Sequence, residues 1–116
     1  MAANVVVSGW DRPVPGREGK AIELFQEYMQ YLGGLQQAGT IQSFEAVLLD
    51  LHGGDLNGFT MIRGDPAKLD ALLSSDEWAT FMTRAGLLLE GFGQIRGVSG
   101  DLLAKQMGLY AKYAAA

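Results

Sequence analysis

Apolar and polar residues alternate along the middle of the chain, from Gln42 to Asp65. Two segments carry this pattern, Phe44–His52 and Gly58–Arg63. Because successive side chains of a strand point to opposite faces of a sheet, both segments are predicted to be β-strands. Between them, Gly53-Gly54-Asp55 and Asn57-Gly58 are typical of turns that tolerate positive φ. We therefore expect a central β-hairpin whose loop is longer than two residues.

Both faces of this hairpin carry large apolar side chains. The face expected to lie against helices carries Val47, Leu49, Leu51 and Ile62. The opposite face, called here the open face, is expected to carry Phe44, Leu48, Phe59 and Met61. Each such side chain contributes about 1.5–3 kcal/mol when fully buried, against a net stability of about 5–15 kcal/mol for a small domain. The open face is therefore expected to be covered by the chain's own tail, by a second subunit or by a ligand.

Before the hairpin, the sequence predicts one strand and one helix. Val5–Trp10 is rich in β-branched residues and is predicted to be a strand. Asp11–Gly16 contains two prolines and is predicted to be a loop. A helix is expected from about Arg17 to Gln37, because apolar residues recur there at helical spacing. They are Ala21, Leu24, Phe25, Tyr28, Leu32 and Leu35.

After the hairpin, helix-start signals appear twice. Asp65 is expected to be an N-cap, with Pro66 in the first helical position. The pattern Ser74-x-x-Glu77 resembles a capping box and predicts that the helix restarts there. A short strand is expected over Gln94–Ser99, and a final helix over about residues 101–114.

The expected order of elements is β-α-β-β-α-β, followed by a helix. This is the ferredoxin-like α+β arrangement, a four-stranded antiparallel sheet with helices on one face. We expect a single domain over residues 1–116, with the ferredoxin-like core at about residues 4–99. The C-terminal helix is expected either to pack on the end of the fold or to cross to a second subunit.

Element order, the hairpin and the helix entry Ser75-Asp76-Glu77-Trp78 resemble the dimeric α/β-barrel superfamily over Val5–Ser99. The resemblance implies a homodimer in which two sheets pack face to face. The superfamily includes cofactor-independent monooxygenases, haem-related enzymes, isomerase-like proteins and many uncharacterised members. It therefore implies a fold, and it does not choose an activity.

Composition limits the classes of molecule that this protein is expected to bind. The net charge of −4 and the lack of a basic cluster argue against nucleic acid and anionic membranes as partners. Cysteine is absent, which excludes disulfides and a thiol nucleophile and is typical of cytoplasmic proteins. No apolar run approaches the roughly 20 residues of a membrane span, and the N-terminus lacks the features of a signal peptide.

The open face is also expected to collect polar side chains around an apolar floor. They are Ser8, Trp10, Asp50, His52, Arg63, Gln94 and Arg96. A small-molecule pocket has this composition. The polar rim of a subunit interface has the same composition, and we favour that interpretation.

His52 is the single histidine, and Asp50 precedes it by two residues on the same expected strand face. The pair could be a general base oriented by a carboxylate, or His52 could be a solvated loop residue. Trp10 and Tyr31 are candidates for stacking on an aromatic ligand. Arg63 and Arg96 could bind a carboxylate, or they could pair with acidic residues of neighbouring strands.

No metal or other cofactor is expected. One histidine without converging carboxylates is a poor ligand set, and the segment Asp55–Gly58 echoes a calcium loop whose bidentate glutamate is replaced by Pro66. We expect a homodimer that binds a small apolar or aromatic molecule between sheet and helices. Two alternatives stay open, a cofactor-independent monooxygenase- or isomerase-like enzyme and a purely structural or interaction module.

Overall fold

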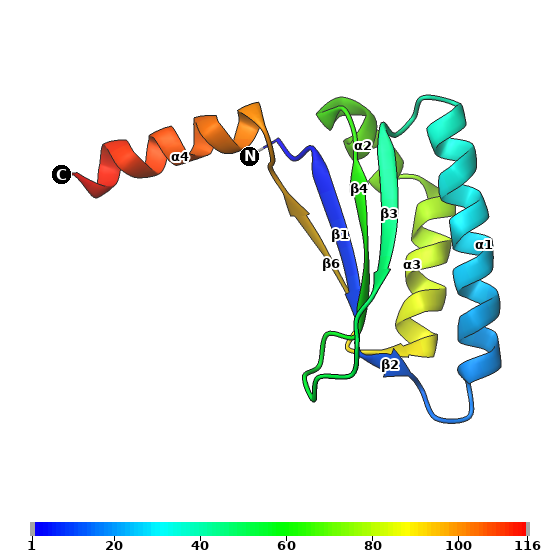
Figure 1. Ribbon diagram of the computed structural model, residues 1–116. Coiled ribbons are helices and arrows are strands. Elements are labelled where there is room, and N and C mark those ends of the chain that lie inside the picture. Colours follow the sequence, from blue (N-terminus) through cyan, green and yellow to red (C-terminus); the bar gives the residue numbers. More distant parts are fainter. Residues whose placement is uncertain (1, 116) are drawn as a thin grey trace.

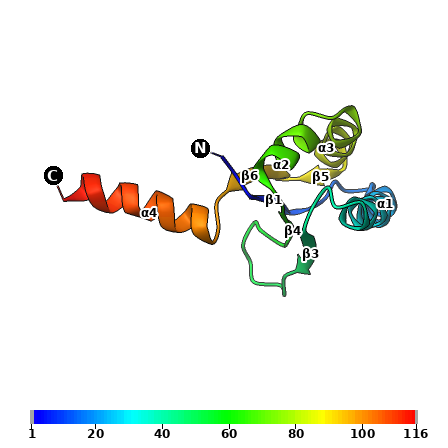
Figure 2. The same ribbon diagram turned by 90° about the horizontal axis from the view of Figure 1, so that it is seen from above.

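The computed structural model describes residues 2–115, and its centre is an antiparallel sheet with the strand order β3-β4-β1-β6. The four strands are β1 (Val5–Trp10), β3 (Ser43–Leu48), β4 (Gly58–Arg63) and β6 (Gly93–Gly97). Helices α1 (Glu18–Gln37) and α3 (Asp76–Leu88) cover one face of this sheet, as Figures 1 and 2 show. The expected ferredoxin-like α+β fold is therefore confirmed.

The helices begin where the capping residues stand. Helix α2 (Pro66–Leu73) follows Asp65, whose carboxylate accepts a hydrogen bond from the Lys68 amide at 3.2 Å. Helix α3 follows Ser75, whose hydroxyl accepts one from the Trp78 amide at 3.3 Å. The capping box expected at Ser74 was wrong by one residue, because Ser74 still ends α2 through a bond from its amide to the Asp70 carbonyl.

Trp78 is the centre of the core. Its side chain is 2% exposed and packs with apolar groups from α1, α2 and the sheet. Its indole N–H donates to Gln94 Oε1 at 2.9 Å, which satisfies the only polar atom of the ring and ties α3 to β6. The other fully buried apolar side chains of this core are Val6, Leu32, Ile41, Ile62 and Leu69.

The hairpin pairs Phe44 with Ile62 and Val47 with Phe59. Residues opposite each other in antiparallel strands share a face, and Ile62 is buried under the helices. Phe44 and Leu48 therefore face the helices and Val47 faces away from them, which reverses the expected assignment. Periodicity had grouped the residues of each arm correctly, but the register between the arms decides which groups share a face.

The first arm is also shorter than expected, since β3 ends at Leu48. The Leu49 amide donates to the Asn57 carbonyl at 2.9 Å and closes the hairpin there. Asn57 is held toward β1, through its amide to the Trp10 carbonyl and through its side chain to Asp11. The chain between Leu49 and Asn57 consequently forms a loop, so the expectation that Leu49 and Leu51 lie on the helix-covered face was wrong.

Two short strands were missed. β2 (Arg12–Pro13) pairs with β5 (Leu89–Glu90) at one end of the molecule, where the sequence predicted a loop and the end of a helix. Arg12 Nε contacts Glu90 Oε2 at 3.0 Å across this pair. A two-residue strand contains no periodicity, so no pattern could indicate it.

Helix α4 (Asp101–Ala114) leaves the body of the molecule on the side opposite α1 and α3 (Figures 1 and 2). None of its residues is buried. It therefore does not pack on the end of its own fold, which was one of the two expected placements. Within the described residues, no helix has both the length and the apolar character needed to span a bilayer.

Candidate functional site

A cavity of about 420 Å³ lies between the sheet and the helices α1 and α3. Aromatic and aliphatic side chains form nearly all of its wall, and no charged residue is found among the described residues that line it. The main apolar side chains are Trp10, Leu24, Phe25, Phe81, Met82, Leu89 and Phe92. Its size and character are those of a site for a small, largely apolar ligand.

The cavity opens between α1 and the edge strand β3. The exposed members of its wall all belong to these two elements, Ile22 and Phe25 of α1 and Ala46 and Leu48 of β3. Leu48 is 83% exposed, so a large apolar side chain stands in water at this entrance. A ligand that entered here would cover apolar surface that the isolated chain leaves bare.

Trp10 forms one end of the cavity because its strand partner is a glycine. A Cβ atom placed on Gly58 would lie 2.5 Å from the Trp10 ring, so a side chain at this position would displace the indole. The Trp10 ring in turn meets Phe25 edge-on, with 6.2 Å between ring centroids. Gly58 was expected to serve a positive φ, but Gly53 is the hairpin glycine that has one. Gly58 instead permits close approach of the indole.

Three hydroxyl groups lie together at the inner wall, those of Ser8, Thr60 and Tyr28. All three oxygens are buried, and none makes a hydrogen bond of acceptable geometry to another described residue. Burial raises the pKa of Tyr28 to about 12, although the nearby hydroxyls of Thr60 and Ser8 oppose the shift. Tyr28 is therefore neutral near pH 7, and its hydroxyl keeps its proton.

The polar residues expected on the open face do not all lie on one face of the sheet. Ser8, Trp10, Gln94 and Arg96 were wrongly placed there, since the register puts all four on the helix-covered face. Gln94 binds the Trp78 indole, and Arg96 pairs with Asp70 of α2 at 3.1 Å. Of the expected set, Arg63 does lie on the open face, where it donates to the Ser99 hydroxyl at 3.0 Å.

His52 and Asp50 lie in the exposed hairpin loop, outside the cavity wall. The Nε2 atom of His52 contacts the Leu56 carbonyl at 2.6 Å, and its Nδ1 accepts from the Gly54 amide at 3.3 Å. Both ring nitrogens are thus engaged by the loop's own backbone, and no hydrogen bond to Asp50 occurs within the described chain. The catalytic role of this pair stays a prediction.

Tyr31 also lies away from the cavity wall. It stacks on Phe81 at 4.7 Å between ring centroids and faces a shallow hollow between α1 and α2. Burial is the main cause that raises the pKa of Tyr31. Of the candidate ligand-binding residues, Trp10 is therefore the one that lines the cavity.

Across residues 2–115, no three His, Asp or Glu side chains cluster in a way that could hold a metal ion.

Small residues aligned across the sheet make room for the cavity, and single-strand patterns did not reveal them. Ala46, Thr60 and Ser8 stand in one row on neighbouring strands. Facing them, Ala21 and Ala85 line the helix side. A signal existed in the sequence, since each strand carries a small residue among larger ones, but the row appears only once the register is known.

No protein-family model matches the sequence, and no curated protein matches it. Solved structures do resemble the fold. A dimeric protein of unknown function with a ferredoxin-like fold from Bacteroides fragilis matches with a TM-score of 0.59 and 8% identity, over 83% of this chain and 95% of that one. HapK from Hahella chejuensis matches with a TM-score of 0.56 and 13% identity, over 84% of this chain and 93% of that one.

A protein of unknown function from Nitrosomonas europaea matches with a TM-score of 0.50 and 16% identity, over 86% of this chain and 94% of that one. At these identities the likeness concerns the fold alone. The fold of this chain is therefore ferredoxin-like, as the order of its elements had predicted.

Proposed function

We propose that this protein is a homodimer that binds a small apolar or aromatic molecule in the cavity between sheet and helices. The observation that carries the proposal is the cavity itself, which is about 420 Å³ in volume and lined by aromatic and aliphatic side chains. Protein interiors are normally packed with few voids larger than a water molecule. An apolar space of this size with an open mouth is therefore suited to a ligand.

The wall supports binding more than catalysis. Its polar side-chain groups are the Trp10 indole and the hydroxyls of Ser8, Tyr28 and Thr60. Histidine, lysine and carboxylate side chains are missing from the described lining, so the wall offers no group that ordinarily takes up or releases protons near pH 7. Binding energy would come from contact with the aromatic walls, with the hydroxyls available to one polar atom of the ligand.

A neutral fluorescent aromatic compound, N-phenyl-1-naphthylamine, tests this proposal. Its emission rises in apolar surroundings, and we expect saturable binding to the wild type with a micromolar dissociation constant. Ala46→Trp adds a large side chain at the exposed mouth and should weaken binding at least about tenfold, since it occupies the entrance. Ala79→Trp, on the exposed side of α3, is the matched control and should bind as the wild type does.

Absence of saturable binding, or equal affinity in wild type and Ala46→Trp, would contradict the proposed site. Circular dichroism of both variants establishes that they fold. Retained ligand in the purified protein, identified by small-molecule mass spectrometry, would name the natural compound.

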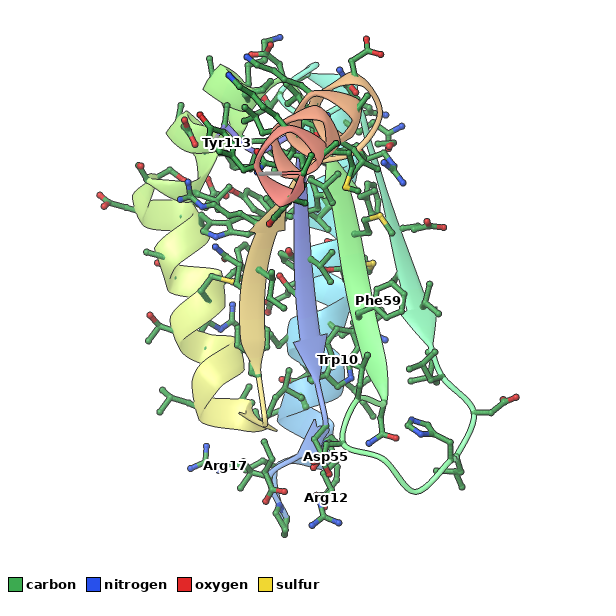
Figure 3. The ribbon with its side chains drawn as sticks, turned by 90° about the vertical axis from the view of Figure 1, so that its left-hand side faces the viewer. Trp10, Arg12, Arg17, Asp55, Phe59 and Tyr113 are labelled. Atoms are coloured by element: carbon green, nitrogen blue, oxygen red, sulfur yellow. The ribbon has the colours of Figure 1, made fainter. Side chains whose placement is uncertain are left out.

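The apolar side chains of the open face support the proposed homodimer. Figure 3 looks onto this face, where Phe59 lies and where no helix except the end-on α4 stands in front of the strands. The strand register places these apolar side chains on it: Val5, Val7, Val47, Phe59, Met61 and Ile95. Ile95 is 68% exposed.

A second copy of the chain is the occupant that the open face suits. Helix α4 buries none of its own residues against this face, and Gly9, Gly93 and Gly97 stand among its apolar side chains. Contiguous apolar surface of this kind marks an interaction site in most proteins. The related fold from Bacteroides fragilis is described as dimeric, which also supports the proposal.

A further inference from the structure

Helix α4 carries an apolar stripe, and none of its residues is buried in its own subunit. The stripe consists of Leu102, Leu103, Met107, Leu109, Tyr110 and Tyr113, and one polar residue, Gln106, lies among them. At 100° per residue these side chains span about 160° of the helix surface. Lys105, Lys112 and Asp101 lie on the other side of the helix. Apart from the half-buried Leu102, the members of the stripe are 46–69% exposed.

The root of α4 is anchored, so the helix has a defined direction. The Asn4 side chain donates to the Ser99 carbonyl at 3.0 Å and accepts from the Ser99 amide at 2.8 Å. Gly100 then turns the chain with a φ of 61°, a conformation that glycine adopts without strain. The chain therefore leaves β6 on the side that the open face looks toward, as Figures 1 and 3 show.

We propose that α4 is an exchanged arm, which packs through its apolar stripe on a second copy of this chain. The inference rests on the proposed homodimer. A second subunit seated on the open face would lie on the side into which α4 projects, and 14 helical residues reach about 21 Å along it. In a two-fold dimer each subunit gives one arm and receives the other. The apolar stripes of both arms are therefore buried.

Charge favours a second copy over a membrane as the occupant. Interfacial membrane helices carry a strongly basic polar side, whereas α4 has two lysines and one aspartate there on a chain of net charge −4. The stripe itself holds two tyrosines and a methionine, which are residues enriched in the buried centres of protein interfaces.

Sedimentation equilibrium of wild type, Tyr110→Glu and Ala104→Glu tests the arm. Tyr110→Glu puts a charge at the middle of the stripe and should raise the dimer dissociation constant about tenfold or more. Ala104→Glu adds the same charge on the opposite side of the helix and should leave it within about twofold of wild type. Because α4 makes no buried contact with its own subunit, both variants should keep the wild-type circular dichroism spectrum.

A crosslink identifies the occupant. The chain has no cysteine, so Tyr113→Cys can be labelled uniquely with a benzophenone maleimide. Irradiation should yield a product of twice the chain mass on a denaturing gel. A wild-type monomer would overturn both the dimer and the arm. A dimer that is equally tight in wild type and Tyr110→Glu would overturn the proposed packing of α4 alone. Crosslinks confined to one chain, or binding of the monomer to anionic lipid vesicles, would have the same consequence.

Discussion

The hydroxyl of Tyr28 shows how one side chain serves both the core and the cavity. Its ring packs against that of Trp78 in the core, with 6.0 Å between ring centroids, and the residue also lines the cavity. Its hydroxyl lies buried near those of Ser8 and Thr60 without a well-formed hydrogen bond. A buried hydroxyl without a partner costs about 1–3 kcal/mol, so these groups are available to a polar atom of a ligand.

The raised pKa of Tyr28 predicts a loss of stability at high pH. The folded pKa is about 12 and the ordinary value is 10.0. The folded protein holds this proton more tightly, so the stabilisation is complete below pH 10 and is lost as pH rises from 10 through 12. At pH 11 the loss relative to pH 9 should be about 1.4 kcal/mol from this group. Urea unfolding at the two pH values measures it.

Tyr28→Phe is the control for that titration, since it removes the ionising group and keeps the ring. The stability of the wild type relative to that of the variant should fall by that amount between pH 9 and pH 11. Equal slopes for the two proteins would mean that the Tyr28 hydroxyl titrates as a solvated phenol does.

At the scale of elements, local capping chemistry sets where the two helices after the hairpin begin. Asp65 and Ser75 each accept a bond from an amide of the first turn. The break between α2 and α3 lets the second helix take a new direction, and α3 then lies against α1. Trp78, which follows the second cap by three residues, is thereby brought into the core and into reach of Gln94.

Removing the cap of α3 should lower stability, and its neighbour provides a matched control. Ser75→Ala loses the acceptor for the Trp78 amide and should cost about 1 kcal/mol in the free energy of unfolding. Ser74→Ala changes an exposed serine whose side chain caps no helix start, so it should stay within about 0.5 kcal/mol of wild type. Chemical denaturation measures both, and the reverse ranking would place the cap at Ser74.

At the scale of the whole molecule, the sheet is covered by helices on one face only. The covered face holds the cavity, and the open face presents Phe59 and Met61 beside Val7. An apolar patch on each subunit is self-complementary about a two-fold axis, which is the commonest symmetry of soluble oligomers. Cavity and proposed interface therefore lie mainly on opposite sides of one sheet, with Val47 of the edge strand bordering both.

Met61→Glu tests the interface without touching the cavity. It puts a carboxylate in the middle of the open face and should convert the dimer to a monomer at micromolar concentration, because the charge would be buried without a partner. Thr83→Glu adds the same charge on the exposed surface of α3 and should leave the dimer intact. Light scattering after size exclusion reads the mass. A monomeric wild type, or a dimeric Met61→Glu, would contradict the proposal that the open face is the dimer interface.

Local sequence patterns determined most of the elements. The strand at Val5–Trp10, the helix over residues 18–37 and the helix over residues 101–114 were all predicted to within one residue. Periodicity and capping are properties of neighbouring residues, so they can be read without knowledge of the fold. The order of these elements then restricted the topology to the ferredoxin-like arrangement.

Only the tertiary structure decided which side of each strand meets the helices. Alternation groups Val47 apart from Phe44, but the pairing of Phe44 with buried Ile62 assigns the faces. The same register aligns the small residues that leave the cavity open and sets Trp10 over Gly58. These features depend on residues distant in sequence, and a one-residue slip in register would reverse every one of them.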